Sequence, residues 1–445
     1  MERRQIIERI RAAGVVGAGG GGFPTHVKVD ARVDTVIANG AECEPLARVD
    51  KLLMAAEPQL VVRGLQLVMQ ACGARRGVLA LKAKAGDSIA ALEGVLRGRG
   101  LQEQIELYLL DDFYPAGDEF VLVRQVTGRV IPEFGLPLQV GVVVSNVTTL
   151  ADVARAVDEG RPVSERVVAV LGEVRRQAAF TVPLGTPLEL LVEAAGGAGV
   201  EGAQLLEGGP MMGRLARSRD VVTKTTSLLL VLPEQHPVVQ RRLRSPERQL
   251  QLTRSACLKC MLCTEICPRN LLGHGLYPDR LMRNLAAGVS EDIDAFTGAW
   301  LCSECGLCAV YGCVMGLDPC AMNRLLKQKL AAAGLDRPPP RQRPERREGP
   351  LRQVPGRRLL ARLAVRDYDV AVARQPFTPS LSRLVLPLRQ HAGAAAVPVV
   401  EPGQEVAAGA LLGEIPPDRL GARVHSPRAG RVLAVDGNMV TLEVE

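Results

Sequence analysis

The residues CLKCMLCTEICP at positions 257–268 and CSECGLCAVYGC at positions 302–313 determine the class of this protein. Each stretch places three cysteines at intervals of two intervening residues, and a fourth cysteine follows a little further on. Three thiolates with this spacing can wrap one corner of a cubane iron–sulfur cluster, and in two-cluster motifs the fourth thiolate ligates the other cluster. A chain that carries two such clusters transfers single electrons.

The spacing therefore predicts two [4Fe-4S] clusters with crossed ligation. One is expected on Cys257, Cys260, Cys263 and Cys313. The other is expected on Cys302, Cys305, Cys308 and Cys267. Zinc is the first alternative, but zinc sites usually pair two Cys-x2-Cys knuckles and leave no use for the third cysteine of each run. Disulfides are the second alternative, and they suit this spacing and a reducing compartment less well.

Length and composition narrow the remaining choices. A chain of 445 residues is too long for one core and suggests about three or four domains. Aromatic residues make up only 3%, which argues against stacking platforms for single-stranded nucleic acid. The N-terminal residues MERRQIIERIRAAG lack the apolar segment of a secretory signal, and no stretch reaches the roughly 18 uninterrupted apolar residues that a membrane span needs. We expect a soluble cytoplasmic protein with no membrane span and no nucleic-acid partner.

The net charge of +7 is partly concentrated in DRPPPRQRPERREGPLR at positions 336–352. We interpret this run as part of a stiff, solvated linker, because proline stiffens such segments and like charges extend them. A nucleic-acid patch is the alternative, and no recognition motif accompanies it.

The pattern of apolar residues divides the chain into five parts. Residues 1–162 alternate strand-like and helix-like segments, which predicts a layered α/β domain with a mostly parallel sheet. Its expected strands are 34–38, 77–82, 104–110 and 140–145, and its expected helices are 51–71, 87–96 and 118–126. Residues 163–245 predict a small β-rich module, with a hairpin at 167–172 and 179–183 and a helix at 188–195. The remaining parts are a cysteine-bearing helical domain at 246–335, an Arg/Pro-rich linker at 336–379 and a compact all-β module at 380–445.

A glycine-rich loop, GAGGGGFPTHVK, occupies positions 17–28. Five glycines in six positions leave the backbone amides bare, so they can approach a phosphate closely. The loop lacks the Gly-Lys-Ser/Thr ending of a Walker A motif and does not follow a strand as a Rossmann fingerprint does. Taken alone, it is either a phosphate cradle or a flexible loop.

Three further segments accompany the loop: NGAECEP at 39–45, YPAGDE at 114–119 and VSNVTT at 144–149. Together the four segments resemble the flavin- and NADH-binding subunit of respiratory complex I and, more closely, the RnfC component of Rnf-type electron-transport complexes. The resemblance implies that FMN and NADH bind in one cleft of the first domain.

The same resemblance assigns roles to individual residues. It implies FMN phosphate and ribityl contacts near Gly17, Gly19, Gly20, Lys28, Asn146 and Thr148. It implies Asn39, Glu42 and Glu44 at the isoalloxazine edge, Gly117, Asp118 and Glu119 on the nicotinamide-nucleotide side, and Phe23 stacked on a ring. Amides bind phosphate and carboxylates bind ribose hydroxyls, so these roles are chemically reasonable, although each carboxylate has a plain surface charge as its alternative. Glu42, Glu44 and Glu119 are the candidate catalytic residues.

The resemblance extends over nearly the whole chain. EGGPMMG at 207–213 and TKT at 223–225 look like the β-grasp, soluble-ligand-binding module of these families. Residues 380–445 look like a barrel-sandwich hybrid that is similar to lipoyl carriers, but HSPRAGRV at 425–432 has no lysine to carry the lipoyl group. The implied fold class is multidomain α/β plus α+β. It joins a layered flavin-binding domain, a β-grasp module, a two-cluster ferredoxin-like helical domain and a C-terminal barrel-sandwich hybrid.

The last module lies at the C-terminal end of this chain. With this order of modules, the chain resembles the cobalamin reductases of propanediol-utilisation microcompartments. This resemblance implies an NADH-dependent cobalamin reductase that passes electrons through FMN and two clusters to a corrinoid, from cob(III)alamin to cob(II)alamin and onward to cob(I)alamin. The implied partners are NADH, a corrinoid or its adenosyltransferase, and a microcompartment shell protein. The alternative is an electron-transfer adaptor that relays electrons to a partner or shell protein and does not act on a corrinoid directly.

Three cysteines lie outside the predicted ligand sets. Cys43 is expected beside the flavin, and Cys72 is expected in the core because free cysteine is usually buried. Cys320 is expected to be a spare thiol near a cluster, with a role as an alternative ligand as the second interpretation.

Overall fold

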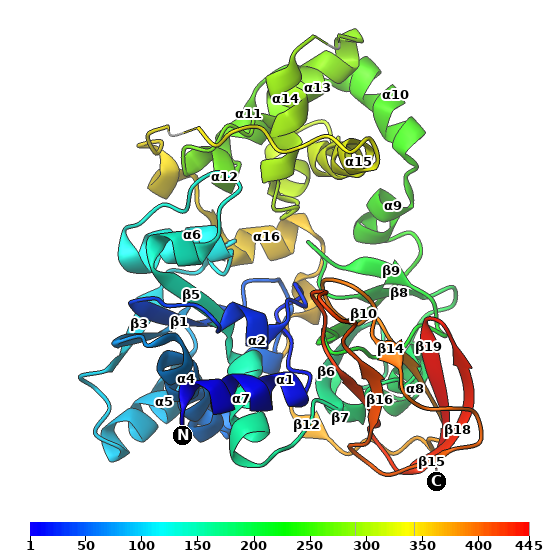
Figure 1. The fold of residues 1–445 in the computed structure, drawn as a ribbon. Coiled ribbons are helices and arrows are strands. Elements are labelled where there is room, and N and C mark those ends of the chain that lie inside the picture. Colours follow the sequence, from blue (N-terminus) through cyan, green and yellow to red (C-terminus); the bar gives the residue numbers. More distant parts are fainter. Residues whose placement is uncertain (290, 342, 445) are drawn as a thin grey trace.

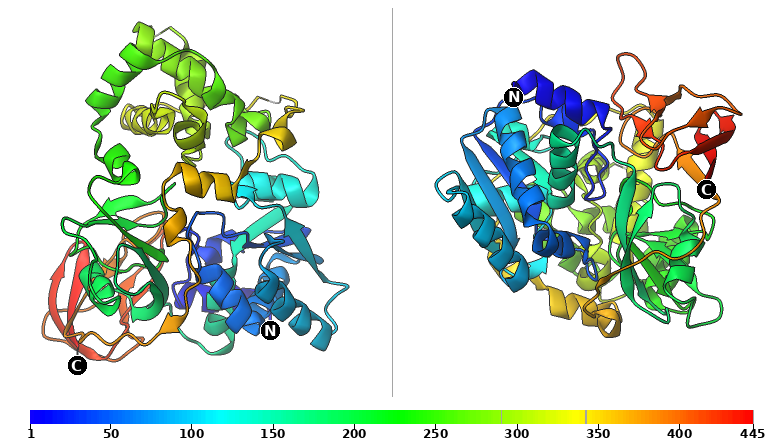
Figure 2. Two further views of the ribbon diagram at one scale, coloured as in Figure 1. Left: turned by 180° about the vertical axis from the view of Figure 1, so that it is seen from behind. Right: turned by 90° about the horizontal axis from the view of Figure 1, so that it is seen from below.

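The computed structural model describes residues 1–289, 291–341 and 343–444 (Figure 1). Ser290, Gln342 and Glu445, which belong to the predicted cluster domain, linker and last domain, lie outside the described residues. An α/β module and two β modules lie side by side, and the cysteine-bearing helices lie at one end of the molecule (Figures 1 and 2). The architecture is multidomain α/β plus α+β, as predicted.

The first module is built on a four-stranded parallel sheet in the order β3-β2-β1-β5. Its strands are β1 (Thr35–Gly40), β2 (Arg76–Lys82), β3 (Ile105–Leu110) and β5 (Val142–Asn146). Its helices are α1 (Arg3–Ala12), α2 (Thr25–Lys28), α3 (Val49–Ala56), α4 (Pro58–Cys72), α5 (Gly86–Gly98), α6 (Glu119–Thr127) and α7 (Val147–Asp158). Val36 and Ala38 join the core shared with α4 and α7, whereas Ile37 joins the core shared with α6. Both faces of the sheet are covered, which explains its nearly continuous apolar strand sequences.

The four expected strands are confirmed within two residues at each end. The helix expected at 51–71 is wrong, because two helices, α3 and α4, meet there at a bend of 96°. Pro58 is the first residue of α4, and proline ends a preceding helix because it lacks an N–H and its ring clashes with the turn before it. Among the described residues, no single helix is long and apolar enough to cross a membrane, and α3 with α4 meets those criteria only as a bent pair.

The second module contains a six-stranded sheet in the order β12-β7-β6-β10-β8-β9. Its strands are β6 (Glu165–Gly172), β7 (Ala178–Pro183), β8 (Gln204–Glu207), β9 (Arg214–Ala216), β10 (Leu228–Leu232) and β12 (Arg374–Gln375), and α8 spans Leu188–Ala194. The predicted hairpin is the antiparallel β6–β7 pair, and the predicted helix is α8. The edge strand β12 comes from almost two hundred residues further along the chain than β7.

The cysteine module consists of short helices around the two cysteine runs. Its elements are α9 (Pro237–Leu243), α10 (Pro246–Ala256), α11 (Leu262–Glu265), α12 (Pro268–Leu271), α13 (Pro278–Ala287), α14 (Ile293–Thr297), η2 (Gly298–Leu301), η3 (Cys308–Gly312) and α15 (Pro319–Ala332). Prolines occupy the first turn of five of the α-helices named here, where the missing N–H costs no hydrogen bond.

Residues 343–379, which we call the strap, belong to the predicted linker but make ordered contacts across the molecule. The strap contains η4 (Gly349–Arg352), β11 (Val354–Pro355), α16 (Gly356–Arg362), η5 (Arg366–Tyr368) and β12. Strand β11 pairs with β4 (Phe113–Tyr114) of the first module, and β12 pairs with β7 of the second. Leu359 of α16 is fully buried. The strap therefore connects modules by packing as well as by covalent continuity.

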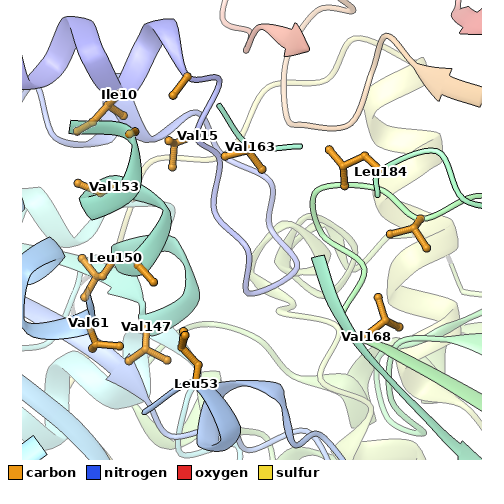
Figure 3. Close-up of a cluster of buried hydrophobic side chains, with 14 of the residues drawn as sticks. Ile10, Val15, Leu53, Val61, Val147, Leu150, Val153, Val163, Val168 and Leu184 are labelled. Atoms are coloured by element: carbon orange, nitrogen blue, oxygen red, sulfur yellow. The ribbon is translucent and has the colours of Figure 1, made fainter. Parts of the chain in front are cut away.

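The C-terminal module contains two small sheets, β13-β19-β18-β15 and β14-β16-β17. Its strands are β13 (Arg383–Pro387), β14 (Val397–Pro398), β15 (Glu405–Val406), β16 (Leu411–Glu414), β17 (Val424–His425), β18 (Gly430–Asp436) and β19 (Met439–Val444). One buried apolar cluster runs from Ile10 and Val153 through Val163 to Leu184 (Figure 3) and on to Leu384. The first, second and C-terminal modules therefore share a core.

Candidate functional site

A cavity of about 370 Å³ opens at the carboxyl ends of β1 and β5. This is the edge of a parallel sheet at which ligands usually bind. The first module lines it with Ala18, Gly19, Asn39, Glu42, Cys43, Glu44, Asp50, Tyr114, Gly117, Asp118, Asn146 and Thr148, among others. Arg166 and Thr226 of the second module, Ser303 and Cys305 of the cysteine module, and Arg374 of the strap complete the wall. We call this cavity the cleft.

The glycine-rich loop is fixed at its base and open at its tip. The amide of Gly17 donates to the carbonyl of Phe23 at 2.9 Å, and the amide of Gly22 donates back to the carbonyl of Gly17 at 3.1 Å. A Cβ atom added at Gly20 would meet nothing within 4 Å, and the φ of +101° at this residue favours glycine. The loop therefore offers bare backbone beside the cleft, as a phosphate cradle requires.

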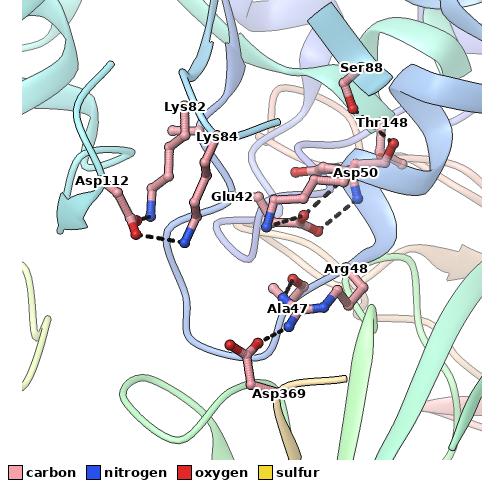
Figure 4. A network of polar contacts seen from close by, with 12 residues as sticks. Glu42, Ala47, Arg48, Asp50, Lys82, Lys84, Ser88, Asp112, Thr148 and Asp369 are labelled. Carbon is pink, nitrogen blue, oxygen red and sulfur yellow. Dashed lines mark hydrogen bonds and ion pairs between the residues drawn. The ribbon is translucent and has the colours of Figure 1, made fainter. Parts of the chain in front are cut away.

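Asn146 and Thr148 are linked to each other and to an acidic residue that sequence reasoning missed. The Oδ1 atom of Asn146 caps α7 by accepting from the amide of Thr148 at 2.9 Å. The side chain of Thr148 donates to one carboxylate oxygen of Asp50 at 2.7 Å (Figure 4). The side chain of Asn146 donates to the other at 2.6 Å. Burial, together with the charge of Glu42, raises the pKa of Asp50 to about 7. Its one sequence signal is its position five residues after the NGAECEP motif.

Glu42 anchors the start of α3. Its Oε1 atom accepts from the amide of Asp50 at 2.8 Å (Figure 4). Its Oε2 atom accepts from the amide of Lys51 at 3.3 Å, and the Lys51 ammonium lies 3.7 Å away. Its φ of +37° is unusual for a residue with a side chain. Glu42 and Asp50 thus place two carboxylates side by side on the cleft wall.

Glu44 connects the first module to the second. Its Oε1 atom accepts from the amides of Met211 and Met212 at 2.7 and 3.3 Å. A Cβ atom at Gly209 would lie 2.1 Å from the Glu44 side chain, so only glycine permits this approach. Burial raises the pKa of Glu44 to about 7, and the two amides act in the opposite direction.

Asn39, Gly117 and Asp118 form a part of the cleft wall that contacts the cysteine module through Asp118. Asn39 donates to the carbonyl of Gly117 at 3.0 Å. Asp118 caps α6 by accepting from two amides of its first turn, at 3.1 and 3.2 Å. Its carboxylate also pairs with Arg269 of the cysteine module at 3.0 Å. Asp118 is therefore held from two sides before any ligand binds.

Five of the expected contact residues do not line the cleft. The structure pairs Lys28 with Glu119 at 2.8 Å, with about a third of each side chain exposed. Phe23 is exposed on the glycine-rich loop, and Gly17 and Gly20 belong to the loop without reaching the described lining. The glycine-rich loop reaches the cleft through Ala18 and Gly19.

The eight cysteines of the two runs surround two small voids. The first, of about 30 Å³, is lined by Cys257, Cys260, Cys263 and Cys313, among others. The second, of about 10 Å³, is lined by Cys267, Cys302, Cys305, Cys308 and Cys320, among others. These are the crossed sets expected from the spacing, with Cys320 added to the second.

The donor chemistry of both voids fits iron–sulfur clusters. Each void gathers four thiols of the two runs, and iron binds thiolates in this arrangement. Backbone amides also point at the sulfur atoms: Glu304 donates to Cys302 at 3.4 Å and Leu317 donates to Cys313 at 3.3 Å. Hydrogen bonds to the sulfurs of a cluster help to set its potential.

The remaining cysteines differ in their surroundings. Cys43 lines the cleft, and burial raises its pKa to about 11. Cys72 is fully buried in the core at the end of α4. Cys320 is buried at the start of α15 and lines the second void together with Cys302.

Comparison with known protein families assigns a description to each module. The Nuo51 FMN-binding domain matches residues 10–155 and the SLBB domain matches residues 167–215. The 4Fe-4S dicluster domain matches residues 256–318, and the RnfC barrel sandwich hybrid domain matches residues 375–444. FMN and iron–sulfur chemistry are thus associated with the modules that contain the cleft and the cysteine voids.

Comparison with whole proteins gives two relatives that match over nearly their whole length and a third that matches over part of it. The chain is 42% identical to the cobalamin reductase PduS of Salmonella typhimurium, over 98% of this chain and 96% of the relative. It is 41% identical to the cobalamin reductase PduS of Citrobacter freundii, over 99% and 97% of the two chains. One component of the Na(+)-translocating ferredoxin:NAD(+) oxidoreductase complex of Acetobacterium woodii is 34% identical over 61% of this chain and 59% of that component. The chain therefore belongs to the PduS family of cobalamin reductases.

Proposed function

We propose that this protein takes electrons from NADH and passes them through FMN and two [4Fe-4S] clusters to a corrinoid. The corrinoid would be reduced from cob(III)alamin to cob(II)alamin and onward to cob(I)alamin. The observation that carries the proposal is a cleft with Gly19 of the glycine-rich loop and buried carboxylates on its wall, and this cleft shares part of that wall with a void ringed by thiols. Full-length similarity to two cobalamin reductases supports the choice of acceptor.

Different residues of the cleft suit different parts of FMN and of the nucleotide. The amides of the glycine-rich loop suit the FMN phosphate, and Asn146 and Thr148 suit the ribityl hydroxyls beside it. Asn39, Glu42 and Glu44 would lie at the ring edge, while Gly117 and Asp118 would face the nicotinamide nucleotide. FMN, when bound, supplies the conversion of a two-electron donor into one-electron steps.

The pKa values of the carboxyl groups suit a site that handles protons. Asp50, with a pKa of about 7, holds a proton part of the time at neutral pH, and its oxygens already accept from Asn146 and Thr148. Glu44 has a similar pKa and touches the second module. Groups poised near neutrality can accept or return a proton when the charge of a neighbouring group changes.

We place the protein in a bacterial microcompartment on the strength of its resemblance to propanediol-utilisation enzymes. NADH, a corrinoid or its adenosyltransferase, and a shell protein are its proposed partners. Residues Lys28, Glu119 and Phe23 stay candidates for contacts that form when the nucleotide is present.

Spectral reduction of cob(III)alamin by the reconstituted protein tests the proposal. The protein loaded with FMN, iron and sulfide should reduce cob(III)alamin with NADH and without a partner. Reduction of artificial dyes alone would instead support the adaptor. Iron and sulfide should each approach about eight per chain, as two cubane clusters require, and zinc in place of iron would contradict the cluster assignment.

A further inference from the structure

We propose that the two cysteine sites are an inlet and an outlet, in a fixed order. The inlet, around Cys267, Cys302, Cys305 and Cys308, receives electrons from the cleft. The outlet, around Cys257, Cys260, Cys263 and Cys313, delivers them to the acceptor. The inference rests on the proposed function, and it adds the direction of the relay and the face at which electrons leave the protein.

The inlet void and the cleft share a wall. Ser303 and Cys305 line both cavities, so the peptide that carries one inlet ligand also bounds the flavin side. Among the residues described as lining the cleft, none belongs to the outlet cysteines. Tyr114, which also lines the cleft, donates from its hydroxyl to the carbonyl of Cys305 at 2.7 Å. This buried hydrogen bond fixes the shared wall from the side of the first module.

A second contact fixes the other side of the inlet. Arg269 lies two residues after Cys267 and pairs with Asp118 on the cleft wall at 3.0 Å. Its guanidinium also lies 3.6 Å from the centre of the Phe120 ring. Both charged groups are about 10% exposed, so water competes little with the ion pair. The cleft and the inlet are therefore held together by buried contacts at Arg269 and at Cys305.

The outlet opens to solvent. Cys260 is exposed, whereas Cys267, Cys305 and Cys308 of the inlet are buried. Exposed apolar side chains flank the outlet ligands: Leu258 is 62% exposed and Val314 is 56% exposed, and Met261 and Met315 are exposed as well. A cluster at this position is closer to a molecule that touches the surface than a cluster at the inlet, where three of the four ligands are buried and Cys302 is half-buried.

The two voids are neighbours, so the relay is continuous. Cys263 of the outlet packs against the buried group that contains Cys308 and Cys320. A Cβ atom at Gly312, next to the outlet ligand Cys313, would lie 3.2 Å from the Cα atom of Cys263. Helix α11 and η3 thus bring the two ligand sets into contact.

Variants that each lack one cluster test the order. In the Cys257→Ser/Cys260→Ser protein, rapid mixing with NADH should still bleach the flavin and the remaining inlet cluster at the wild-type rate, while cob(III)alamin reduction is lost. In the Cys302→Ser/Cys305→Ser protein, NADH should reduce the flavin but leave the outlet cluster oxidised. An outlet cluster reduced as fast as in the wild type would overturn the proposed order.

A measurement without NADH separates this inference from the proposed function. Both single-cluster proteins are reduced with dithionite, and a soluble dysprosium chelate is added as a relaxing agent. The EPR signal of the outlet cluster should relax more strongly than that of the inlet cluster, because the outlet is nearer to solvent. Equal relaxation would refute the assignment even if NADH reduces cobalamin well. Conversely, failure of NADH to reduce either cluster would refute the proposed function and leave the EPR comparison valid.

Surface variants cover the case in which the cysteine variants do not fold. Leu258→Asp adds a charge beside the outlet and should slow cob(III)alamin reduction without changing the rate at which NADH bleaches the clusters. The matched control is Leu433→Asp, on the exposed surface of β18 in the C-terminal module. Equal effects of the two variants on cob(III)alamin reduction would contradict an outlet at Leu258.

Discussion

Asp50 illustrates how a single residue takes its position in the cleft from tertiary structure. Its two donors, Asn146 and Thr148, lie 96 and 98 residues further along the chain. The motifs around those donors were recognisable in the sequence, and so was the acidic segment before α3. The contact between α3 and α7 was not, because packing of two helices on a sheet leaves no local signature. Sequence reasoning therefore found the donors and missed their acceptor.

The Asp50→Asn substitution should make the free energy of unfolding depend less on pH in the acidic range. The pKa of Asp50 is raised from 3.8 to about 7, so the folded chain binds more protons than the unfolded chain in this window. The stability that Asp50 contributes to the folded protein therefore falls as the pH rises through this window, by on the order of a few kcal/mol. Urea unfolding of the wild type and the variant at pH 5 and pH 7.5 measures the difference.

The exposed Asp87 provides the control for that experiment. Asp87→Asn should retain the wild-type difference between the two pH values. If Asp50→Asn retains it too, Asp50 is ionised normally in the folded protein and its role in proton handling is wrong.

Gly209→Ala should separate the first and second modules at Glu44. The added methyl group would lie 2.1 Å from the carboxylate, so the loop or the side chain has to move. Such overpacking typically costs about 1–3 kcal/mol. We expect a lower midpoint of unfolding and faster loss of bound FMN on dilution, measured by flavin fluorescence. Gly437→Ala, where nothing lies within 4 Å, should change neither.

At the scale of elements, long and strongly patterned segments were predictable and short ones were not. The apolar strands of the first sheet and the β6–β7 hairpin were recognised from their composition. The α3–α4 break was missed because apolar periodicity continues through Pro58, although the proline itself was a usable signal. Strands β11 and β12 have two residues each, too few to form a pattern. Strand β11 forms a two-stranded pair with β4, and β12 adds to the edge of the second sheet beside β7.

Leu359→Ala should loosen the strap. Leu359 is fully buried in α16, and removal of a buried leucine side chain costs about 2–5 kcal/mol. Since the strap is rich in arginine, limited trypsin digestion followed by mass spectrometry should show faster cleavage within residues 343–379. Leu351→Ala is the matched control, because that leucine is 84% exposed. Equal cleavage rates in the two variants would mean that α16 does not hold the strap in place.

At the scale of the whole molecule, one buried lysine joins three modules. Lys224 of the second module donates from Nζ to the carbonyls of Gly14 in the first module and Arg423 in the C-terminal module, both at 2.6 Å. Burial, assisted by the charge of Arg166, lowers its pKa from 10.5 to about 7. The TKT motif was visible in the sequence as a family feature, but its position at a three-way junction depends on how the modules pack.

The Lys224→Gln substitution should remove an increase in folding stability that the wild type shows at alkaline pH. Between pH 7 and 10.5 the unfolded chain binds the proton that folded Lys224 has lost, so stability from this group rises with pH across that window. The variant should lose this rise and should also be less stable at pH 9, by on the order of 1–3 kcal/mol, because a carbonyl loses its donor. Thermal unfolding at pH 7 and pH 9 provides the test. The exposed Lys329→Gln variant should behave like the wild type, and a Lys224→Gln protein that does so as well would contradict this role.

The order of modules along the chain was predictable, whereas the order of the electron relay was not. Cysteine spacing indicated the two ligand sets, because ligation is a local pattern with one crossover. Which set meets the cleft depends on Tyr114 and Arg269, residues whose partners lie in other modules. The cysteine spacing does not indicate which cluster is nearer to the cleft. Only the packing of the first module against the cysteine module distinguishes the two clusters.

The strap has a consequence for how the protein is made. A ribosome adds roughly 5–20 residues per second, and domains fold as they emerge. The first and second modules leave it long before Arg374, which completes the cleft wall, and before β12, which completes the second sheet. The nascent chain therefore has an unfinished cleft and an open sheet edge until most of its length has been synthesised. Arg374 joins the cleft wall late in translation, and the interval before its synthesis is the time at which a bulky cofactor meets the least obstruction.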